Sequence, residues 1–332
     1  MLAMCISCAG LQAQDIATRY FEIVPPKNKV TQSLYNTVEF LDSRGDTSHI
    51  GAISVGLLKN RDAMLKLKTP FQQQLSGLIT ELTDSTARDG RLLFQLKQFD
   101  FVETYGTRYC YLGAALYAKQ DAGYKRLSIL DTILIVRIPD VAKAIQKEGN
   151  KIISDFVSKG LLLQPADTTL YPIEVVENID SVEKRQIPVY NTTAYSDGLY
   201  TSYASFKNQA PDMQGLVALN KDGSVSSVKM VDSAGKKIKL KSKSLYAVIT
   251  KGKLFIATEY GYYSMQKISD NFYFTGNVRV AASSGDISTG QIAFGLVGAA
   301  LASSGNEARY DMIIDHLTGK FIHITRLKID TD

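Results

Sequence analysis

Two of the three histidines in this 332-residue chain, His316 and His323, are spaced so that one metal ion could use both. They flank Leu317-Thr318-Gly319, a turn signal, and strands paired around such a turn would bring the two imidazoles toward each other. A zinc site also needs a third ligand, which Asp311 or Asp315 would have to supply. Ordinary surface or hydrogen-bonded histidines explain the same pattern, and we predict no metal site and no cofactor.

The other reactive side chains do not form a recognisable catalytic set. The chain has no Gly-x-Ser-x-Gly motif, and His49 near Asp46 in a loop is only a fragment of a triad. Cys110 lies in an apolar segment and is expected to pack as a small buried hydrophobe. Two carboxylates for glycoside hydrolysis cannot be picked out among 33 acidic residues. We predict that the protein is not an enzyme, with a hydrolase acting on glycan or peptide as the alternative.

The strongest surface feature is basic. Lys237, Lys239, Lys241 and Lys243 alternate along the chain, so an extended backbone would place them on one face. A solvated strand face that resists edge-to-edge aggregation is one reading. The other is a docking surface for an envelope protein or for an anionic lipid or glycan surface. Nucleic acid is not expected as a partner.

A second unusual feature is the apolar, small-residue run over residues 290–302. It is too short to cross a bilayer. Gly295 and Gly298 would allow close backbone packing, so we predict that Phe294 and these glycines form a packing or partner-binding segment. If the run is exposed, a structural subunit of a surface assembly becomes the alternative function.

The first 14 residues indicate where the protein works. They are apolar or small almost throughout and end at Ala13-Gln14, as an export signal would. No Lys or Arg precedes the apolar core, which a start upstream of Met1 would supply. Cleavage before Cys8 followed by lipidation is the alternative to soluble export. We predict an exported protein that is periplasmic or associated with the outer membrane.

Bulk composition limits the classes that remain. The chain is 45% hydrophobic and 21% charged, which fits a folded protein and not a disordered one. No later apolar run approaches 18 residues, so no transmembrane segment is expected in the mature chain. The formal net charge of +5 is too small to imply nucleic acid by itself.

The pattern of elements predicts an α+β protein in two parts. Residues 15–160 carry one helix with Thr69 as its cap and Pro70 at its first position, three strands and a second helix ending at Gly160, typical of an antiparallel sheet covered by helices. The apolar residues that repeat at helical spacing, and should form the buried face of the first helix, are Phe71, Leu75, Leu78, Ile79 and Leu82. Residues 161–195 are interpreted as a linker. Residues 196–332 consist of short strands with turn signals, which predict an all-β meander, a small sandwich or an open barrel.

Short motifs add one set of resemblances for each half of the chain. Asp42-Ser43-Arg44, Ile50-Gly51 and the helix led by Pro70 resemble YajG-type lipoproteins, and the layout through residue 160 is similar to auxiliary lipoproteins of ABC-type envelope transporters. The second half resembles uncharacterised exported proteins of Bacteroidota. The segments that carry this second likeness are Asp197-Gly198-Leu199-Tyr200, Phe206-Lys207-Asn208 and Leu317-Thr318-Gly319-Lys320. These likenesses imply an envelope location and a fold, and no catalytic residues. They lead to the expectation of an exported, envelope-associated accessory or binding protein.

Overall fold

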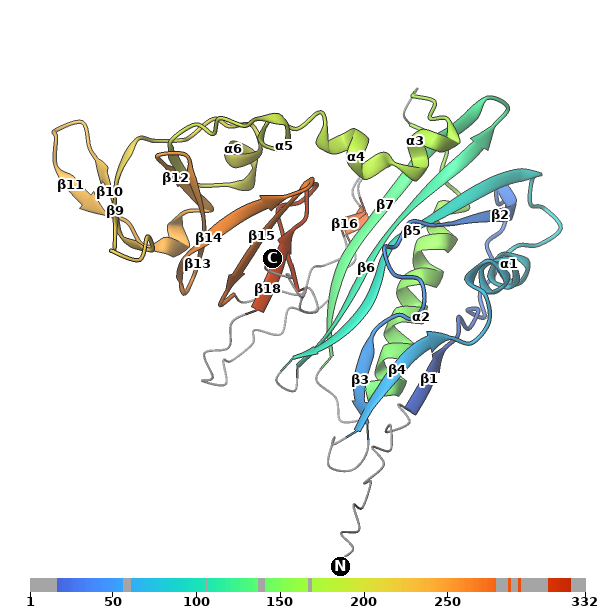
Figure 1. The fold of residues 1–332 in the computed structure, drawn as a ribbon. Helices are drawn as coiled ribbons and strands as arrows, with labels where there is room; N and C mark the ends of the chain where they lie inside the picture. The colour runs from blue at the N-terminus through green and yellow to red at the C-terminus, as the bar shows by residue number, and fades with distance from the viewer. Residues whose placement is uncertain are drawn as a thin grey trace, which may run out of the picture. The chain divides into compact units, whose positions relative to one another are not determined.

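The computed structural model describes residues 17–55, 61–104, 107–136, 141–166, 169–278, 286–287, 292–293 and 310–323. The predicted export signal, residues 1–14, lies outside the described residues, as do Phe294, Gly295 and Gly298. Strands and helices are mixed and the sheets are open, so the predicted α+β class is confirmed (Figure 1). Within the described residues, no helix has both the length and the hydropathy needed to span a bilayer.

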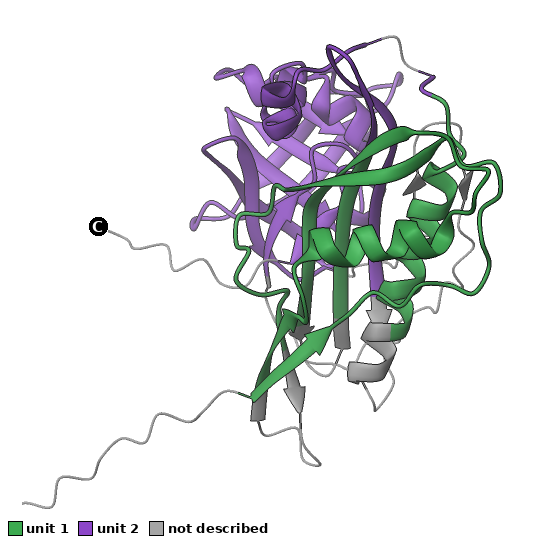
Figure 2. Ribbon diagram, turned by 90° about the vertical axis from the view of Figure 1, so that its right-hand side faces the viewer, with its two compact units in different colours: residues 1–116, 135–164 green, residues 117–134, 165–332 purple. Residues whose placement is uncertain are grey.

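The chain divides into two compact units (Figure 2). Unit 1 comprises residues 1–116 and 135–164, and unit 2 comprises residues 117–134 and 165–332. The division passes through strands β6 (Thr107–Gln120) and β7 (Gly123–Val136), so each unit contains two separate stretches of chain. The domain boundaries predicted at residues 160 and 195 stay predictions.

A six-stranded sheet of mixed direction combines four strands from residues 35–136 with two short strands, residues 286–287 and 292–293. β2 runs parallel to β5, so the prediction of an antiparallel sheet is wrong for this pair. The connection between these two strands contains a hairpin and a helix, and such a long crossover is what a parallel pair requires. In sheet order the strands are β17 (Ile292–Ala293), β16 (Asp286–Ile287), β7 (Gly123–Val136), β6 (Thr107–Gln120), β5 (Gly90–Thr104) and β2 (Tyr35–Asp42).

A second, three-stranded sheet lies within unit 1. β4 (Arg61–Leu67) is its central strand, with β1 (Ala17–Phe21) parallel on one side and β3 (Ala52–Val55) antiparallel on the other. The loop before β3 is held by Arg44, whose guanidinium donates to both carboxylate oxygens of Asp42 and to the His49 carbonyl. The Asp42-Ser43-Arg44 motif therefore works as an internal clamp on this loop.

Helix α1 (Phe71–Leu82) buries the face that its sequence spacing predicts. The ring of Phe71 lies 5.1 Å from that of Phe40 and 5.8 Å from that of Phe94. Helix α2 (Val141–Gly160) ends at the predicted glycine, and its Phe156 meets Phe94 edge-on at 6.0 Å. These contacts place the core of unit 1 between the helices and the sheet. The buried α1 residues that were predicted are Phe71, Leu75, Leu78, Ile79 and Leu82.

Unit 2 contains an antiparallel meander of seven strands. One of its two-residue hairpin turns is Lys251–Gly252, where both residues have positive φ, as a type I′ turn requires. In sheet order the strands are β19 (Phe321–His323), β18 (Tyr310–Ile314), β15 (Asn271–Gly276), β14 (Gly261–Ile268), β13 (Lys253–Thr258), β12 (Ala247–Thr250) and β8 (Gly198–Tyr200).

A smaller antiparallel sheet packs against one end of this meander. Its strands, in sheet order, are β11 (Lys237–Lys239), β10 (Val225–Val231) and β9 (Gly215–Leu219). The shared core joins one face of this sheet to strands β8, β12 and β13. The buried residues of that core are Leu199, Val228, Leu245, Val248, Phe255 and Ala257.

Short helices precede and follow β8. The segment interpreted as a linker carries three of them, so it has local structure of its own. Ser202 begins α6: its hydroxyl oxygen accepts a hydrogen bond from the Ser205 amide, and its own backbone N–H donates to the Ser205 hydroxyl oxygen. The helices are α3 (Ile173–Glu177), α4 (Ile179–Lys184), α5 (Pro188–Asn191) and α6 (Tyr203–Lys207).

Candidate functional site

The alternating lysines lie at the edge of the small β9–β11 sheet. Lys239 on β11 stands opposite Lys229 on β10, and Lys237 stands opposite Val231. Residues directly opposite each other in an antiparallel pair, and residues two apart along a strand, share a face. Lys229, Lys237 and Lys239 therefore lie on the same face, next to Leu216 of β9, which stands opposite Lys229.

The alternation stops earlier than its sequence suggests. β11 ends at Lys239, and Lys241 and Lys243 lie at the start of and within a 3₁₀ turn, η1 (Ser242–Ser244). The cause is the core below, because Leu245 is buried there and the chain must turn to reach it. All four lysines are exposed, yet only Lys237 and Lys239 share a strand face. Their assignment as a binding site stays a prediction.

We name Leu216, Lys229, Val231, Lys237 and Lys239 the lysine face. Two of its five members are apolar and nevertheless open to solvent, Leu216 at 47% and Val231 at 46%. The opposite face of the same sheet is the one that packs into the core, where Val228 is fully buried. The lysine face thus combines positive charge with exposed hydrocarbon.

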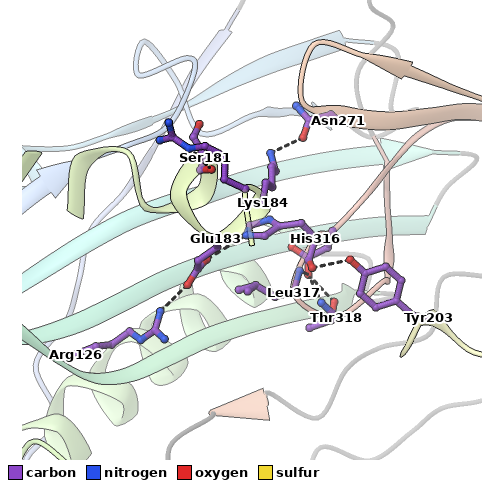
Figure 3. Close-up of polar contacts among 11 residues, drawn as sticks. Arg126, Ser181, Glu183, Lys184, Tyr203, Asn271, His316, Leu317 and Thr318 are labelled. Atoms are coloured by element: carbon purple, nitrogen blue, oxygen red, sulfur yellow. Dashed lines mark hydrogen bonds and ion pairs between the residues drawn. The ribbon is translucent and has the colours of Figure 1, made fainter. Parts of the chain in front are cut away.

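A second polar cluster surrounds Glu183 in unit 2 (Figure 3). One carboxylate oxygen of Glu183, Oε1, accepts from Arg126 Nη1 at 2.6 Å, and the other, Oε2, lies 3.1 Å from His316 Nε2. These side chains are mostly buried, at 24% exposed for Arg126, 15% for Glu183 and 7% for His316. Asp180 joins them: one ligand atom each of Asp180, Glu183 and His316 lie within 4.8 Å of one another.

The backbone of His316 is held on both sides. The Asp315 carboxylate accepts from the Leu317 and Thr318 amides at 3.1 and 2.7 Å, which closes the turn after β18. The Tyr203 hydroxyl donates to the His316 carbonyl at 2.6 Å, as Figure 3 shows. The turn ends at Gly319, whose φ of +73° favours glycine.

Helix α4 supplies the two acids. Asp180 and Glu183 are three residues apart, which places them on one side of a helix. The helix is fixed by Ile179, which is buried, and by Lys184, whose Nζ donates to Asn271 Oδ1 at 2.7 Å. Arg126 comes from β7 and also lies 6.0 Å from the ring centre of Tyr171.

The histidines do not have the surroundings that a zinc site built on Asp311 or Asp315 would need. Neither Asp311 nor Asp315 joins His316: the first accepts from Thr275 Oγ1, and the second closes the turn. His323 of β19 stands opposite Met312 of β18, and burial lowers the pKa of His323 to about 4. The Asp180-x-x-Glu183 spacing was the sequence signal for this cluster, and it lay inside the segment interpreted as a linker.

Replacing Arg126 with methionine should lower the free energy of unfolding by about 2–3 kcal/mol, because Glu183 would lose its cation while staying mostly buried. This value lies between those for exposed and for fully buried pairs. Chemical denaturation measures it. Arg91→Met is the control: its ion pair with Glu39 is far more exposed, so about 1 kcal/mol or less is expected. Equal losses in both variants would contradict a special role for the Glu183 cluster.

Comparisons with known proteins match one part of the chain to a family but indicate no chemical function. A family model described as a family of unknown function, DUF6563, matches residues 198–331, which include the lysine face and His316. No curated protein matches. Among solved structures, the chain is similar to protein XCC0632 from Xanthomonas campestris, of family-model DUF330. The identity is 10% and the TM-score 0.31, over 43% of this chain and 95% of that one.

Proposed function

We propose that this chain is an exported, envelope-associated binding protein that docks through the lysine face onto an anionic phospholipid surface. The observation that carries the proposal is the mixture on that face: lysines and exposed aliphatic side chains share one side of a sheet whose other side is core. Peripheral membrane proteins bind by this pairing of positive charge with apolar contact.

The charges favour a lipid surface. Each lysine held near an anionic membrane contributes about 1 kcal/mol, and the attraction fades over about 8 Å at physiological salt. Lys236, Lys241 and Lys243 are exposed near the same sheet and would add to the field. The acid within this stretch, Asp232, accepts from the Ala234 and Lys236 amides in the turn between β10 and β11, and its single negative charge is outnumbered by the lysines.

Changing Lys237 and Lys239 together to glutamine should weaken binding to phosphatidylglycerol vesicles by roughly 30-fold, since about 2 kcal/mol is removed. Partition is measured by vesicle sedimentation at physiological salt. The matched control is Lys27→Gln with Lys29→Gln, which removes the same charge from exposed positions in unit 1.

The control separates a located surface from bulk charge. The control variant should bind within about twofold of the unmodified chain, and both variants should keep the same thermal unfolding midpoint because the replaced side chains are exposed. Equal weakening by the two pairs, or no weakening by Lys237→Gln with Lys239→Gln, would count against the lysine face.

A further inference from the structure

We propose that Asp180, Glu183 and His316 bind a divalent transition-metal ion, with zinc as the best match. Two carboxylates and one imidazole are an oxygen and nitrogen donor set that zinc accepts, with a fourth position left for water or a ligand. The three ligand atoms already lie within 4.8 Å of one another. This site is separate from the lysine face and does not depend on its function.

The spacing of the donor atoms suits a tetrahedral ion. Metal–ligand distances of about 2.0–2.2 Å place neighbouring ligands about 3.3 Å apart in a tetrahedron. Glu183 Oε2 and His316 Nε2 are 3.1 Å apart, close to one edge of that figure. A metal ion would replace this direct contact with two coordinate bonds, and Asp180 would complete the set from the same side of α4.

The surroundings fix the donors as a metal site requires. The ligands come from α4 and from the turn after β18, and Glu183 and His316 are 133 residues apart in the chain. Arg126 holds Glu183 through Oε1 and leaves Oε2 facing the imidazole, an outer-shell role that orients a metal ligand. Tyr203 holds the His316 carbonyl. Such prior ordering lowers the cost of binding.

Charge also favours a cation at this point. Asp180 and Glu183 as carboxylates bring two negative charges, and Arg126 offsets one of them. With a neutral imidazole, the two carboxylates and the guanidinium give the largely buried cluster a net charge of about −1. A divalent ion would change this net charge to about +1.

Calorimetric titration of the full chain with zinc, after removal of metal by a chelator, tests the site. We expect one zinc ion per chain at the cluster and a higher thermal midpoint when it is bound. Asp180→Asn and His316→Gln should each weaken this binding by at least about tenfold. The matched control is His49→Gln, which removes another histidine paired with an acid, Asp46, and should bind as the unmodified chain does.

A background variant removes a rival source of zinc binding. Cys5 and Cys8 are spaced as thiolate ligands often are, so the titrations are carried out with Cys5→Ser and Cys8→Ser in every protein. In this background, absence of zinc binding would overturn the proposal. So would binding that survives both Asp180→Asn and His316→Gln.

Arg126→Met gives a readout that a purely structural ion pair would not move. Because Arg126 orients Glu183 as an outer-shell partner, its loss should weaken zinc binding about tenfold. Saturating zinc should still raise the stability of the variant, since the ion supplies the positive charge that Glu183 has lost. Asp180→Asn keeps the shape of the side chain, so this variant should fold. Its circular dichroism spectrum checks that any loss of zinc binding is not caused by unfolding. A variant Arg126→Met that zinc neither binds nor stabilises would contradict the site.

Discussion

Replacing Phe206 with alanine is expected to lower the free energy of unfolding by about 3–5 kcal/mol. Phe206 of α6 is fully buried, and its ring meets those of Tyr200 and Tyr246, each at 5.7 Å. Truncation would leave a cavity among rigid rings that cannot close it. The loss should reach the candidate metal site, because Tyr246 donates to the carbonyl of Gly319 at the end of the turn that carries His316.

Denaturant unfolding measures this loss, and two controls define it. Phe206→Leu keeps much of the volume and should cost about 1.5 kcal/mol or less. Tyr260→Ala removes an aromatic side chain that is 50% exposed and should change stability by about 0.5 kcal/mol or less. A Phe206→Ala variant no less stable than Tyr260→Ala would show that α6 does not anchor this core.

Acidification from pH 6.5 to 4 is expected to remove about 3 kcal/mol of stability through His323 alone. Burial lowers the pKa of His323 from 6.5 to about 4 in the folded chain. In this window the unfolded chain binds a proton that the folded chain excludes, so stability is fully present above pH 6.5 and declines as pH falls toward 4. Each pKa unit corresponds to about 1.4 kcal/mol.

The measurement compares unfolding free energies of the unmodified chain and His323→Gln across this pH range. Glutamine does not titrate, so the difference between the two proteins should change by about 3 kcal/mol from pH 6.5 to 4. Parallel profiles for the unmodified chain and His323→Gln would contradict the burial of this imidazole in a neutral form.

Local patterns were enough to predict the elements that bury a regular face. The spacing of Phe71, Leu75 and Leu78 predicted the inner face of α1, and Gly160 predicted the end of α2. The start of α1 was predicted at the right place. Pro70, however, occupies the N-cap position, and no side-chain hydrogen bond caps the helix. Strand direction was not available from spacing, because period-two alternation is the same for parallel and antiparallel neighbours.

The lysine face shows where alternation stops being informative. Lys237 and Lys239 follow the pattern because they occupy a strand, while Lys241 and Lys243 leave it because Leu245 turns the chain into the core. The third lysine on this face is Lys229, which lies on the neighbouring strand β10. Pairing between strands decided this, and cross-strand partners cannot be read from spacing along one segment.

The Glu183 cluster could not be assembled from sequence for a similar reason. Its acids and its histidine are far apart in the chain, and a helix of six residues, α4, carries too little periodicity to be recognised. The turn beside His316 was visible from Leu317-Thr318-Gly319, yet the turn says nothing about what the imidazole faces.

Sedimentation of the unmodified chain with vesicles of known composition tests the proposed function most directly. We expect the bound fraction to rise with phosphatidylglycerol content, to be low on phosphatidylcholine alone, and to fall steeply when salt is raised, because the attraction comes from lysines near an anionic surface. Binding that is equal on both lipids, or unaffected by salt, would contradict docking through the lysine face.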